Sequence, residues 1–307
     1  MKTRVFIDGS EGTTGLRIAQ RLAERDDVQL MQISPELRKD VGERARLMSQ
    51  SDIVFLCLPD DAARVAAKMA LQAGTRVIDA STAHRTDPEW VYGFPELGYR
   101  DRIRSSPRVA VPGCHAGGFL ALITPLVRLS VIPADAQISC FSLTGYSGGG
   151  KKMIAQYEDP SREPILGAPR CYALGQTHKH LPEMQAISGL ETPPHFSPIV
   201  SDYYSGMLVA VPLFCEQFGV TCKQIEKIYE SFYTDGVVSV TDGAGFDASG
   251  ALMSGRDDMK IAVCGNDVRA TVYASFDNLG KGASGAAVQC FNLMCGKDEK
   301  YSLVTGD

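Results

Sequence analysis

The sequence predicts an α/β protein, in which an N-terminal Rossmann-like doubly wound domain is followed by an α+β domain with a largely antiparallel sheet. Three observations predict this class. Short apolar runs alternate with helical patterns up to residue 81, and glycines mark the turn after the first run. From about residue 135 the apolar segments become longer, with fewer helical patterns between them. Alternating strands and helices indicate a parallel sheet, whereas consecutive strands indicate an antiparallel one.

The first half of the chain supports the parallel sheet element by element. Apolar runs predict strands at 2–8, 28–34, 52–59 and 75–81, and helical patterns lie between them at 16–25, 36–50 and 61–74. Residues 53–58 are continuously apolar, as in parallel strands that are buried on both faces. The stretch 84–108 is rich in Arg, Ser and Pro and is predicted to be irregular.

The second half begins with segment 108–129, which predicts a strand, a Pro-Gly turn and an apolar helix. Longer strands are predicted in segments 138–150, 207–215, 236–241 and 269–277. The last segment, 280–296, carries small and apolar residues at helical spacing. We expect it to be a closing helix that packs back on the first domain.

Composition limits the classes of function. The chain has 307 residues, of which 44% are hydrophobic and 22% charged, as in an average globular enzyme of two domains. The net charge of −5 provides no basic field for a phosphate backbone, so no nucleic acid partner is expected. No apolar run reaches the roughly eighteen residues of a membrane span, and a cytoplasmic enzyme is expected. The nine cysteines lack zinc-site spacing, so no metal is expected.

Three glycines, Gly9, Gly12 and Gly15, lie between the first strand and the first helix. Glycine is needed where backbone approaches a pyrophosphate, and the helix start adds N–H groups and a partial positive charge. A tight turn without a ligand is the alternative. The position after the first strand of a βαβ pattern favours a dinucleotide site.

The end of the second predicted strand indicates which dinucleotide is bound. An NAD enzyme usually has a carboxylate there for the ribose hydroxyls, but this strand ends at Ser34, and Glu36, Arg38 and Lys39 follow. A hydroxyl and a guanidinium suit the 2′-phosphate of NADP, so NADPH is the predicted cofactor. A solvated charged loop is the alternative.

Cys114 is the candidate nucleophile among the cysteines. It ends the Pro-Gly-Cys turn at 112–114, where a strand gives way to an apolar helix, and a helix start stabilises a thiolate. Two histidines, His178 and His180, lie just before a helix that Pro182 can open, a position that suits a neutral imidazole acting as a base. The pattern does not choose between these histidines. Packing and surface-loop roles are the alternatives.

Two further glycine-rich segments carry polar residues. Residues 147–152, Ser-Gly-Gly-Gly-Lys-Lys, predict a loop that can form an anion nest, with a flexible solvated loop as the alternative. Asn278 precedes the closing helix, and its amide can pair with a carboxamide. A helix cap is the alternative there.

Together these motifs resemble the N-acetyl-gamma-glutamyl-phosphate reductase family, specifically its shorter bacterial type. The resemblance runs nearly the whole length and is carried by DGSEGTTG at 8–15, DASTAHR at 79–85, VPGCHAGG at 111–118, SGGGKK at 147–152, HKHLPE at 178–183 and DNLGKGASGAAVQCFNLM at 277–294. It implies an NADPH-dependent oxidoreductase of arginine biosynthesis that converts N-acetyl-L-glutamyl 5-phosphate to N-acetyl-L-glutamate 5-semialdehyde and phosphate. It also implies an NADP-binding domain at 1–113, completed by the C-terminal helix at 283–307, and a catalytic and dimerisation domain at 114–282.

The resemblance implies roles for single residues. Cys114 would form a thioester, with His180 as the acid–base residue and Glu183 orienting it. Cofactor contacts are predicted at Gly9, Gly12, Thr13, Gly15, Ser34, Arg38, Ser81, Gly148 and Asn278, and substrate contacts at Arg85, Ser147 and Lys151. The thiolate would attack the acyl phosphate, and NADPH would then reduce the thioester. A homo-oligomer, either a dimer or a tetramer, is expected.

Two departures from the longer type of this family leave the residue that binds the substrate carboxylate unassigned. His-Ala-Gly follows Cys114 where the longer type usually has Tyr-Pro, and Ser205-Gly206 stands where it tends to have Arg-Gly. Aspartate-semialdehyde dehydrogenase, acting on a related acyl phosphate, is the main rival, although its cysteine typically follows Asn rather than Gly113. The same motifs are also compatible with a dehydrogenase for a free aldehyde and with a non-catalytic NADP-sensing regulator.

Overall fold

The structure is a computed structural model that describes residues 2–306. The described chain forms two compact units, residues 2–112 with 283–303 and residues 113–282 with 304–306. The expected first domain extended to 113 and through 283–307. The last residues of that segment belong instead to the second unit, because the amide of Val304 donates to the Asp257 carboxylate at 2.8 Å.

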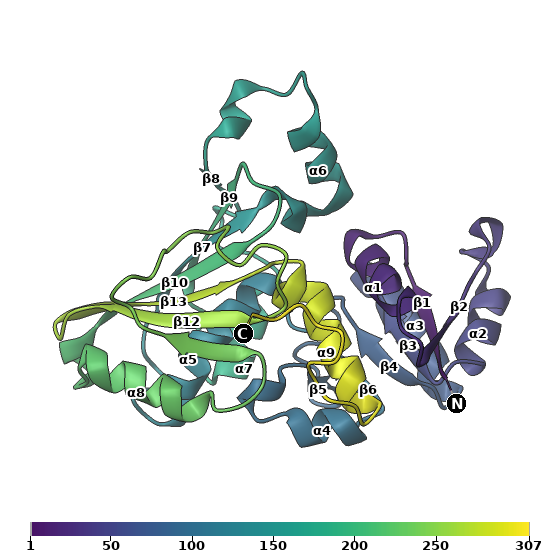
Figure 1. Ribbon diagram of the computed structural model, residues 1–307, viewed down its shortest axis with the longest axis horizontal. Coiled ribbons are helices and arrows are strands. Elements are labelled where there is room, and N and C mark those ends of the chain that lie inside the picture. The colour runs from purple at the N-terminus through teal and green to yellow at the C-terminus, as the bar shows by residue number, and fades with distance from the viewer. Residues whose placement is uncertain (1, 307) are drawn as a thin grey trace. The chain divides into compact units, whose positions relative to one another are not determined.

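The first unit is built on a six-stranded parallel sheet (Figure 1). Its strands are β1 (Thr3–Asp8), β2 (Val28–Met31), β3 (Ile53–Leu56), β4 (Arg76–Asp79), β5 (Val91–Tyr92) and β6 (Arg108–Ala110), in the order β2-β1-β3-β4-β6-β5. Its helices are α1 (Thr13–Ala23), α2 (Val41–Ser49), α3 (Asp60–Gln72), α4 (Arg100–Ser105) and α9 (Gly285–Met294). All the strand pairs in this sheet are parallel, as the alternation of strands and helices predicts.

Helices cover both faces of this sheet. One core cluster joins Val5 and Ile7 to α1, α4 and α9, and the other joins Phe6 to α2 and α3. Successive residues of β1 therefore point to opposite helix layers, which is the doubly wound arrangement. The closing helix α9 lies within the first cluster, where Phe291 contacts Phe55 with ring centroids 5.7 Å apart.

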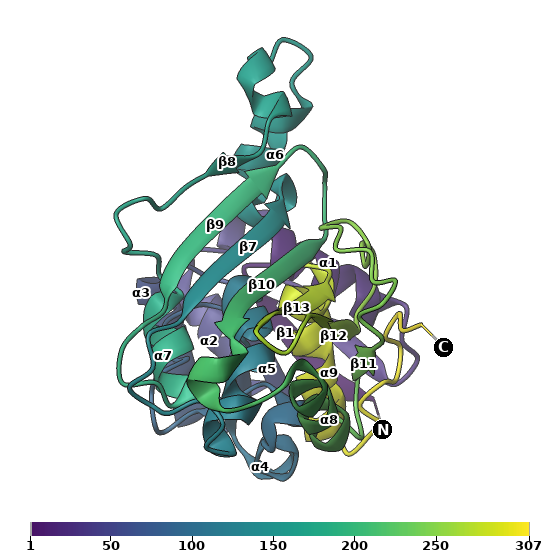
Figure 2. The same ribbon diagram turned by 90° about the vertical axis from the view of Figure 1, so that its left-hand side faces the viewer.

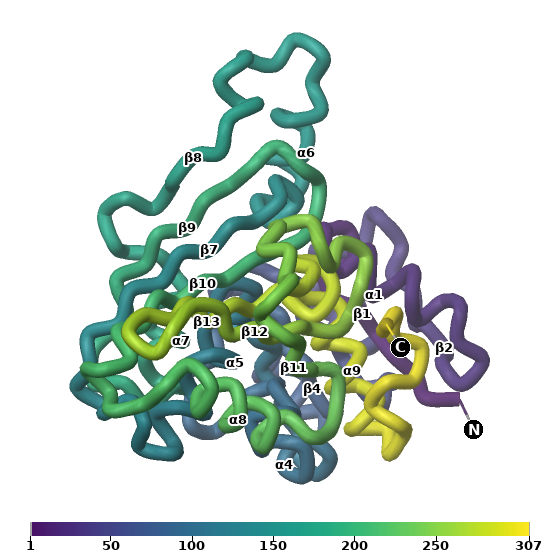
Figure 3. Tube along the Cα trace, turned by 60° about the vertical axis from the view of Figure 1, so that its left-hand side comes forward, coloured from purple at the N-terminus to yellow at the C-terminus, as the bar shows by residue number. Residues whose placement is uncertain are grey.

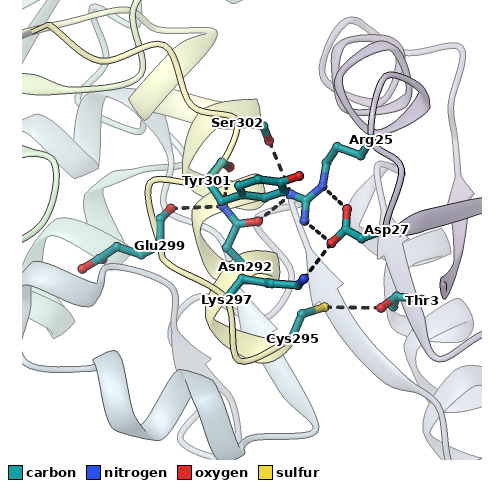
Figure 4. A network of polar contacts seen from close by, with 9 residues as sticks. All are labelled: Thr3, Arg25, Asp27, Asn292, Cys295, Lys297, Glu299, Tyr301 and Ser302. Carbon is teal, nitrogen blue, oxygen red and sulfur yellow. Dashed lines mark hydrogen bonds and ion pairs between the residues drawn. The ribbon is translucent and has the colours of Figure 1, made fainter. Parts of the chain in front are cut away.

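A polar network fixes the C-terminal segment to the first unit (Figure 4). The Arg25 guanidinium is nearly fully buried, pairs with Asp27 at 2.8 Å, and donates to the side-chain oxygen of Asn292 at 2.6 Å. It also lies over the ring of Tyr301, 4.6 Å from the centroid. A buried guanidinium needs such partners, and here they tie the end of α1 to α9 and to the chain that follows it.

Several predicted boundaries in this unit were wrong. The helix expected at 36–50 is a short 3-10 helix, Pro35–Leu37, followed by α2, because Asp40 caps α2 by accepting the Glu43 amide at 2.7 Å. The second strand ends at Met31 rather than at residue 34. The stretch 84–108, predicted to be irregular, contains α4 and the short strand β5.

The second unit contains a seven-stranded mixed sheet in the order β11-β12-β13-β10-β7-β9-β8. Its strands are β7 (Ser139–Gly145), β8 (Arg170–Cys171), β9 (His195–Ser201), β10 (Met207–Phe214), β11 (Val238–Thr241), β12 (Met259–Gly265) and β13 (Arg269–Phe276). Neighbouring strands are antiparallel except β7 with β9 and β11 with β12. The patterns missed β8, β9 and β12; β9 contains Pro198, a residue that weakens a strand prediction.

Helices α5 (Cys114–Arg128), α7 (Leu181–Ser188) and α8 (Cys222–Phe232) belong to this unit, and Figure 2 looks onto β7, β9 and β10 from the side away from α5 and α7. Side chains alternate along β7, where Phe141 is exposed and the flanking Cys140 and Ser142 are buried. The sheet thus has one face packed on helices and one face left open.

Residues 146–172, which follow β7 and include β8, form a projection that we name the arm (Figure 3). The arm contains α6 (Gly150–Glu158) and a small core in which Tyr157 and Leu166 pack with Val200 of β9. The loop predicted at 147–152 was wrong. The chain there forms a 3-10 turn, Tyr146–Gly149, and then enters α6 at Gly150, whose φ of +71° suits glycine.

Candidate active site

The three glycines of the turn after β1 differ in what a side chain at each position would contact. A side chain at Gly9 would clash with the carbonyl oxygen of Cys57, and one at Gly15 would clash with that of Gly9, so the fold itself requires these two glycines. Gly12 is different: it is exposed, and a Cβ there would come no nearer than 3.6 Å to another group. Gly12 precedes α1, which begins at Thr13 and has no side-chain cap among the described residues.

This helix start fits the pyrophosphate of a dinucleotide. The N–H groups of the first turn of α1 have no acceptor within the helix, and the helix dipole places partial positive charge on them. The absent side chain at Gly12 leaves that turn uncovered. The first unit can therefore hold a dinucleotide at α1 through backbone alone.

Charged residues surround the end of β2. Ser34 and Arg38 are exposed, and the Arg38 guanidinium pairs with Glu11 of the glycine turn at 3.0 Å. Sequence reasoning missed Arg44 of α2, which pairs at 2.6 Å with Asp8, a buried carboxylate at the end of β1. Arg44 offsets a negative charge that would otherwise repel phosphate next to the glycine turn.

The segment after β4 is organised by a buried carboxylate. Asp79 accepts hydrogen bonds from the Ser81 amide at 2.9 Å and the Ser81 hydroxyl at 2.8 Å, and it lies 2.6 Å from the His84 ring. His84 stacks on Trp90 with ring centroids 4.1 Å apart. Ser81, a predicted cofactor residue, is thus held rigidly at the carboxyl end of β4.

Arg85, a predicted substrate residue, donates from Nε to the Val111 carbonyl at 2.9 Å and from Nη2 to the Ala80 carbonyl at 3.2 Å. The guanidinium therefore links the ends of β4 and β6, three residues before Cys114. This contact is with the main chain of the first unit.

In the second unit, α5 begins at Cys114, as the Pro-Gly turn predicts. The Gly113 amide donates to the buried carboxylate of Glu183 at 2.9 Å, so α7 holds the turn that leads into the cysteine. On the other side, Gly282 packs so closely that a Cβ there would lie 2.9 Å from the Cys114 Cβ. The thiol is half-buried at the start of a fifteen-residue helix, where the helix dipole favours the thiolate.

The two candidate histidines differ in their contacts. His180 is buried and immediately precedes α7, whereas Nδ1 of His178 accepts the main-chain amide of His180 at 3.1 Å. Burial, aided by the charge of Lys179, lowers the pKa of His178 to about 4. His178 is therefore a neutral ring whose Nδ1 is occupied by a main-chain amide.

A third histidine, His115, was not predicted to matter beyond its departure from the longer family type. It is buried beside Cys114, with Nδ1 at 2.7 Å from the Ser142 hydroxyl and Nε2 at 2.6 Å from the Tyr172 hydroxyl. Burial, with smaller contributions from the charges of His178 and Lys179, lowers the pKa of His115 to about 3. A neutral imidazole between two hydroxyls has both nitrogens satisfied.

Asn278 connects two loops of the second unit. Its side-chain oxygen accepts the Gly206 amide at 2.8 Å, and its side-chain nitrogen donates to the Ser147 hydroxyl at 3.0 Å. Ser147 is fully buried, whereas Gly148 and Lys151 are exposed at the start of the arm. The structure therefore brings Ser147 and Asn278 together and leaves Lys151 on the surface.

Asp277, missed by the sequence patterns, is a fully buried carboxylate that organises the same region. It accepts from the Leu279 amide at 2.7 Å, from the Ser205 hydroxyl at 3.0 Å, and from the Gly255 amide. Lys281, also unforeseen, is buried two residues beyond Leu279. The buried character of both charged side chains is invisible in the sequence, because Asp and Lys are usually exposed.

Neither a metal site nor a membrane span is found among residues 2–306. No cluster of three or more His, Cys, Asp or Glu side chains is arranged to hold a metal ion there. Over the same residues, no helix combines the length and apolar character needed to cross a bilayer.

Two family models match the chain. Residues 35–106 match the semialdehyde dehydrogenase NAD binding domain, and residues 114–278 match the semialdehyde dehydrogenase dimerisation domain. A dinucleotide-binding unit followed by a unit with a cysteine at a helix start defines an oxidoreductase of the semialdehyde dehydrogenase class.

Curated relatives narrow the class. The N-acetyl-gamma-glutamyl-phosphate reductase of Brucella anthropi is 44% identical over 312 residues, which cover 97% of this chain and 100% of the relative. N-acetyl-gamma-glutamyl-phosphate reductase 2 of Nostoc sp. is 42% identical over 323 residues, which cover 98% and 99%. The chain belongs to the N-acetyl-gamma-glutamyl-phosphate reductase family. The motif resemblance, the oxidoreductase class and the dinucleotide cofactor are confirmed.

Solved structures share the fold. Aspartate semialdehyde dehydrogenase II from Vibrio cholerae aligns with a TM-score of 0.74 at 19% identity, covering 96% of this chain and 99% of that one. The Candida albicans aspartate semialdehyde dehydrogenase with NADP aligns with a TM-score of 0.67 at 14% identity, covering 97% and 100%. These likenesses confirm the predicted fold class, a Rossmann-like unit followed by a unit with a largely antiparallel sheet.

Proposed function

We propose that this enzyme reduces N-acetyl-L-glutamyl 5-phosphate to N-acetyl-L-glutamate 5-semialdehyde and phosphate with NADPH, in arginine biosynthesis, through a thioester on Cys114. The observation that carries the proposal is the start of α5, where a half-buried thiol lies at the N-terminal end of the helix. The names of the close relatives supply the substrate.

The first half of the reaction uses Cys114 and the backbone beside it. The thiolate attacks the acyl carbon, a C–S bond forms, and the C–O bond to phosphate breaks as phosphate leaves with its electron pair. The Gly117 amide already donates to the Gly113 carbonyl at 2.7 Å, and the Gly113 amide donates to Glu183. We propose that the amides of residues 115 and 116, earlier in the first turn, stabilise the oxyanion.

The second half requires a proton. NADPH, when bound, supplies hydride to the thioester carbon. His180 protonates the resulting oxyanion and then accepts that proton back as the C–S bond breaks and the aldehyde leaves. His178 is poorly suited to this role, because Nδ1 accepts a backbone amide and burial lowers the pKa of the ring to about 4. Glu183 is proposed to orient His180 from one turn along α7.

The cofactor residues follow from the first unit. The backbone at Gly12 and Thr13 would hold the pyrophosphate, and Ser34 and Arg38 would hold the 2′-phosphate of NADPH. The ion pair between Arg38 and Glu11 supports this assignment, since it shows that the guanidinium reaches the glycine turn. Ser81 would contact the dinucleotide at the carboxyl end of the neighbouring strand β4.

The other predicted contact residues differ in whether their side chains already have hydrogen-bond partners within the protein. The side chains of Ser147 and Asn278 hydrogen-bond to each other, and we propose that Ser147 contacts the substrate and Asn278 the cofactor. Lys151, exposed in the first turn of α6 after Gly148, would attract the substrate phosphate. Arg85 would act chiefly by holding the Val111 carbonyl near the catalytic turn.

A homodimer or a tetramer built from it, located in the cytoplasm, is part of the proposal. The second unit carries the dimerisation domain, and its open sheet face exposes Phe141 on β7 and Phe214 on β10. Exposed aromatics on a sheet face favour a partner of the same kind. Light scattering of the wild type and of a variant with both residues changed to Ser tests the interface, and a fluorescent fusion tests the location.

The activity is tested by a coupled assay with N-acetylglutamate, its kinase, ATP and NADPH. We expect phosphate-dependent reversal with the semialdehyde, and little turnover of aspartyl phosphate. Cys114→Ser should lower kcat by several orders of magnitude while leaving NADPH binding intact. Cys171→Ser, which changes an exposed thiol, is the matched control. Retention of more than about a tenth of the activity in Cys114→Ser would exclude the thioester mechanism, and faster turnover of aspartyl phosphate would exclude the substrate.

A further inference from the structure

A chain of hydrogen bonds runs through His115, the residue after the nucleophile. Ser142 of β7 lies at one ring nitrogen, at 2.7 Å, and the hydroxyl of Tyr172 lies at the other, at 2.6 Å. These hydrogen bonds therefore join three elements, namely α5, the strand β7 and the end of the arm. Neither the motifs nor the names of the relatives assign it a role.

The histidine at the centre of this hydrogen-bonded chain is enclosed by aromatic rings. The centroids of His178, His180 and Phe196 lie 5.5, 5.7 and 5.3 Å from that of His115. Such packing leaves the imidazole little freedom to turn. Because His115 and Cys114 are consecutive in the first turn of α5, a fixed ring fixes the backbone that carries the sulfur.

We propose that Ser142, His115 and Tyr172 form a positioning chain that holds the start of α5 so that the Cys114 sulfur stays aligned with the first-turn amides. This rests on the nucleophilic role proposed for Cys114. It extends that role by adding residues that act through the helix start and do not touch substrate.

The chemistry of the three groups suits this task. A neutral imidazole has one donor and one acceptor, and each hydroxyl can donate or accept, so every proton arrangement of the chain is satisfied. The ionisable groups that face His115 are Cys114 on its own helix, Tyr172 from the arm, and His178, Lys179 and His180 from the segment before α7. Burial, and in smaller part the negative charge of Cys114, raises the pKa of Tyr172 well above its usual value, so the phenol stays protonated and can donate to or accept from the ring.

The arm provides a matched pair of tyrosines for the test. Tyr172 and Tyr157 both pack in the core of the arm, but the Tyr157 hydroxyl has no hydrogen-bond partner within residues 2–306. Tyr157→Phe therefore removes a hydroxyl that makes no hydrogen bond among those residues, whereas Tyr172→Phe removes the hydroxyl at one end of the hydrogen-bonded chain. Ser142→Ala removes the opposite end without changing the arm.

The readouts are kcat, KM and the pH dependence of Cys114 alkylation by iodoacetamide, followed by mass spectrometry of the Cys114 peptide. We expect Tyr172→Phe and Ser142→Ala each to lower kcat about ten-fold or more with little change in KM, since small misplacements of reacting groups are costly. The pH midpoint of alkylation should rise in both variants, because the sulfur loses its alignment with the helix start. Tyr157→Phe should match the wild type in every readout.

Wild-type kcat together with an unchanged alkylation midpoint in Tyr172→Phe would overturn the proposal. Equal losses in Tyr157→Phe would also overturn it, since they would show that the packing of the arm matters and the hydrogen bond does not. If circular dichroism shows that either Tyr172→Phe or Ser142→Ala does not fold, the other of these two variants decides whether the proposal holds. An active Cys114→Ser enzyme would instead refute the proposed function, so the two failures are distinguishable.

Discussion

Replacing Gly282 with alanine tests how tightly the fold positions the nucleophile. The added Cβ would lie 2.9 Å from the Cys114 Cβ, 3.1 Å from the Asp277 carbonyl oxygen and 3.3 Å from the ring of Phe276. Ordinary contact between carbons begins near 3.4 Å, so the first separation must grow by about 0.5 Å. Backbone and ring restrain the new methyl on two sides, and the displacement therefore falls largely on Cys114.

A shift of that size should cost more in rate than in stability. Misplacement by about 1 Å can lower a rate about a hundred-fold, so we expect kcat to fall by about ten-fold, with NADPH binding unchanged. Overpacking should lower the unfolding free energy by about 1–3 kcal/mol. The measurements are steady-state kinetics, NADPH fluorescence titration and thermal unfolding.

The matched control is Gly167→Ala, because a Cβ at Gly167 meets nothing within 4 Å. Both substitutions restrict the unfolded chain to the same extent, so any difference between them reports on the folded state. If Gly282→Ala loses stability but keeps kcat within two-fold of the wild type, then the sulfur tolerates displacement and the reasoning about its placement is refuted.

Three further predictions concern the histidines and the cofactor. His180→Asn should lower kcat by about 10²–10⁴, and His178→Asn much less, because an Asn side chain can still accept the His180 amide; equal losses would reverse the assignment. Arg38→Ala should raise KM for NADPH about ten-fold and leave NADH unaffected, and an unchanged ratio of kcat/KM for the two cofactors would place the 2′-phosphate elsewhere. The folded-state pKa values of His115 and His178, about 3 and 4, lie below the ordinary value of 6.5, so the unfolded chain binds more protons between these limits. Stability should therefore fall as pH drops from about 6.5 to 4, as urea midpoints would show, and His178→Asn should reduce that slope.

The parallel half of the fold was predictable because its signals are local. Strands β1 to β4 are short apolar runs, and α1 has its apolar residues on one face, as at Ile18 and Leu22. The short elements β5 and α4 carry no such signal and were missed. The mixed sheet of the second unit was harder to predict. Its strand β9 pairs in parallel with β7 from more than 50 positions away, and Pro198 interrupts its pattern. Such long-range pairing leaves little trace in a local window.

The candidate site divides in the same way. A cysteine after Pro-Gly and a histidine before Leu-Pro-Glu are signals that the sequence carries on its own. The sequence alone does not reveal the residues that hold this cysteine and this histidine in place. Tyr172 reaches His115 across 57 positions, and the Glu183 carboxylate reaches the Gly113 amide across 70. Only the fold shows that these buried polar groups are satisfied by one another.

Two buried carboxylates hold the backbone on either side of the nucleophile. Glu183 accepts the Gly113 amide on the N-terminal side of Cys114, and Asp277 accepts the Leu279 amide at the base of the turn that brings Gly282 against the cysteine. Burying a carboxylate is costly unless N–H or O–H donors replace its water, so each carboxylate must capture nearby donors. Each main-chain amide captured in this way fixes the segment that carries it. The desolvation that makes these two acids unfavourable in isolation is therefore also what makes the backbone around the sulfur stiff.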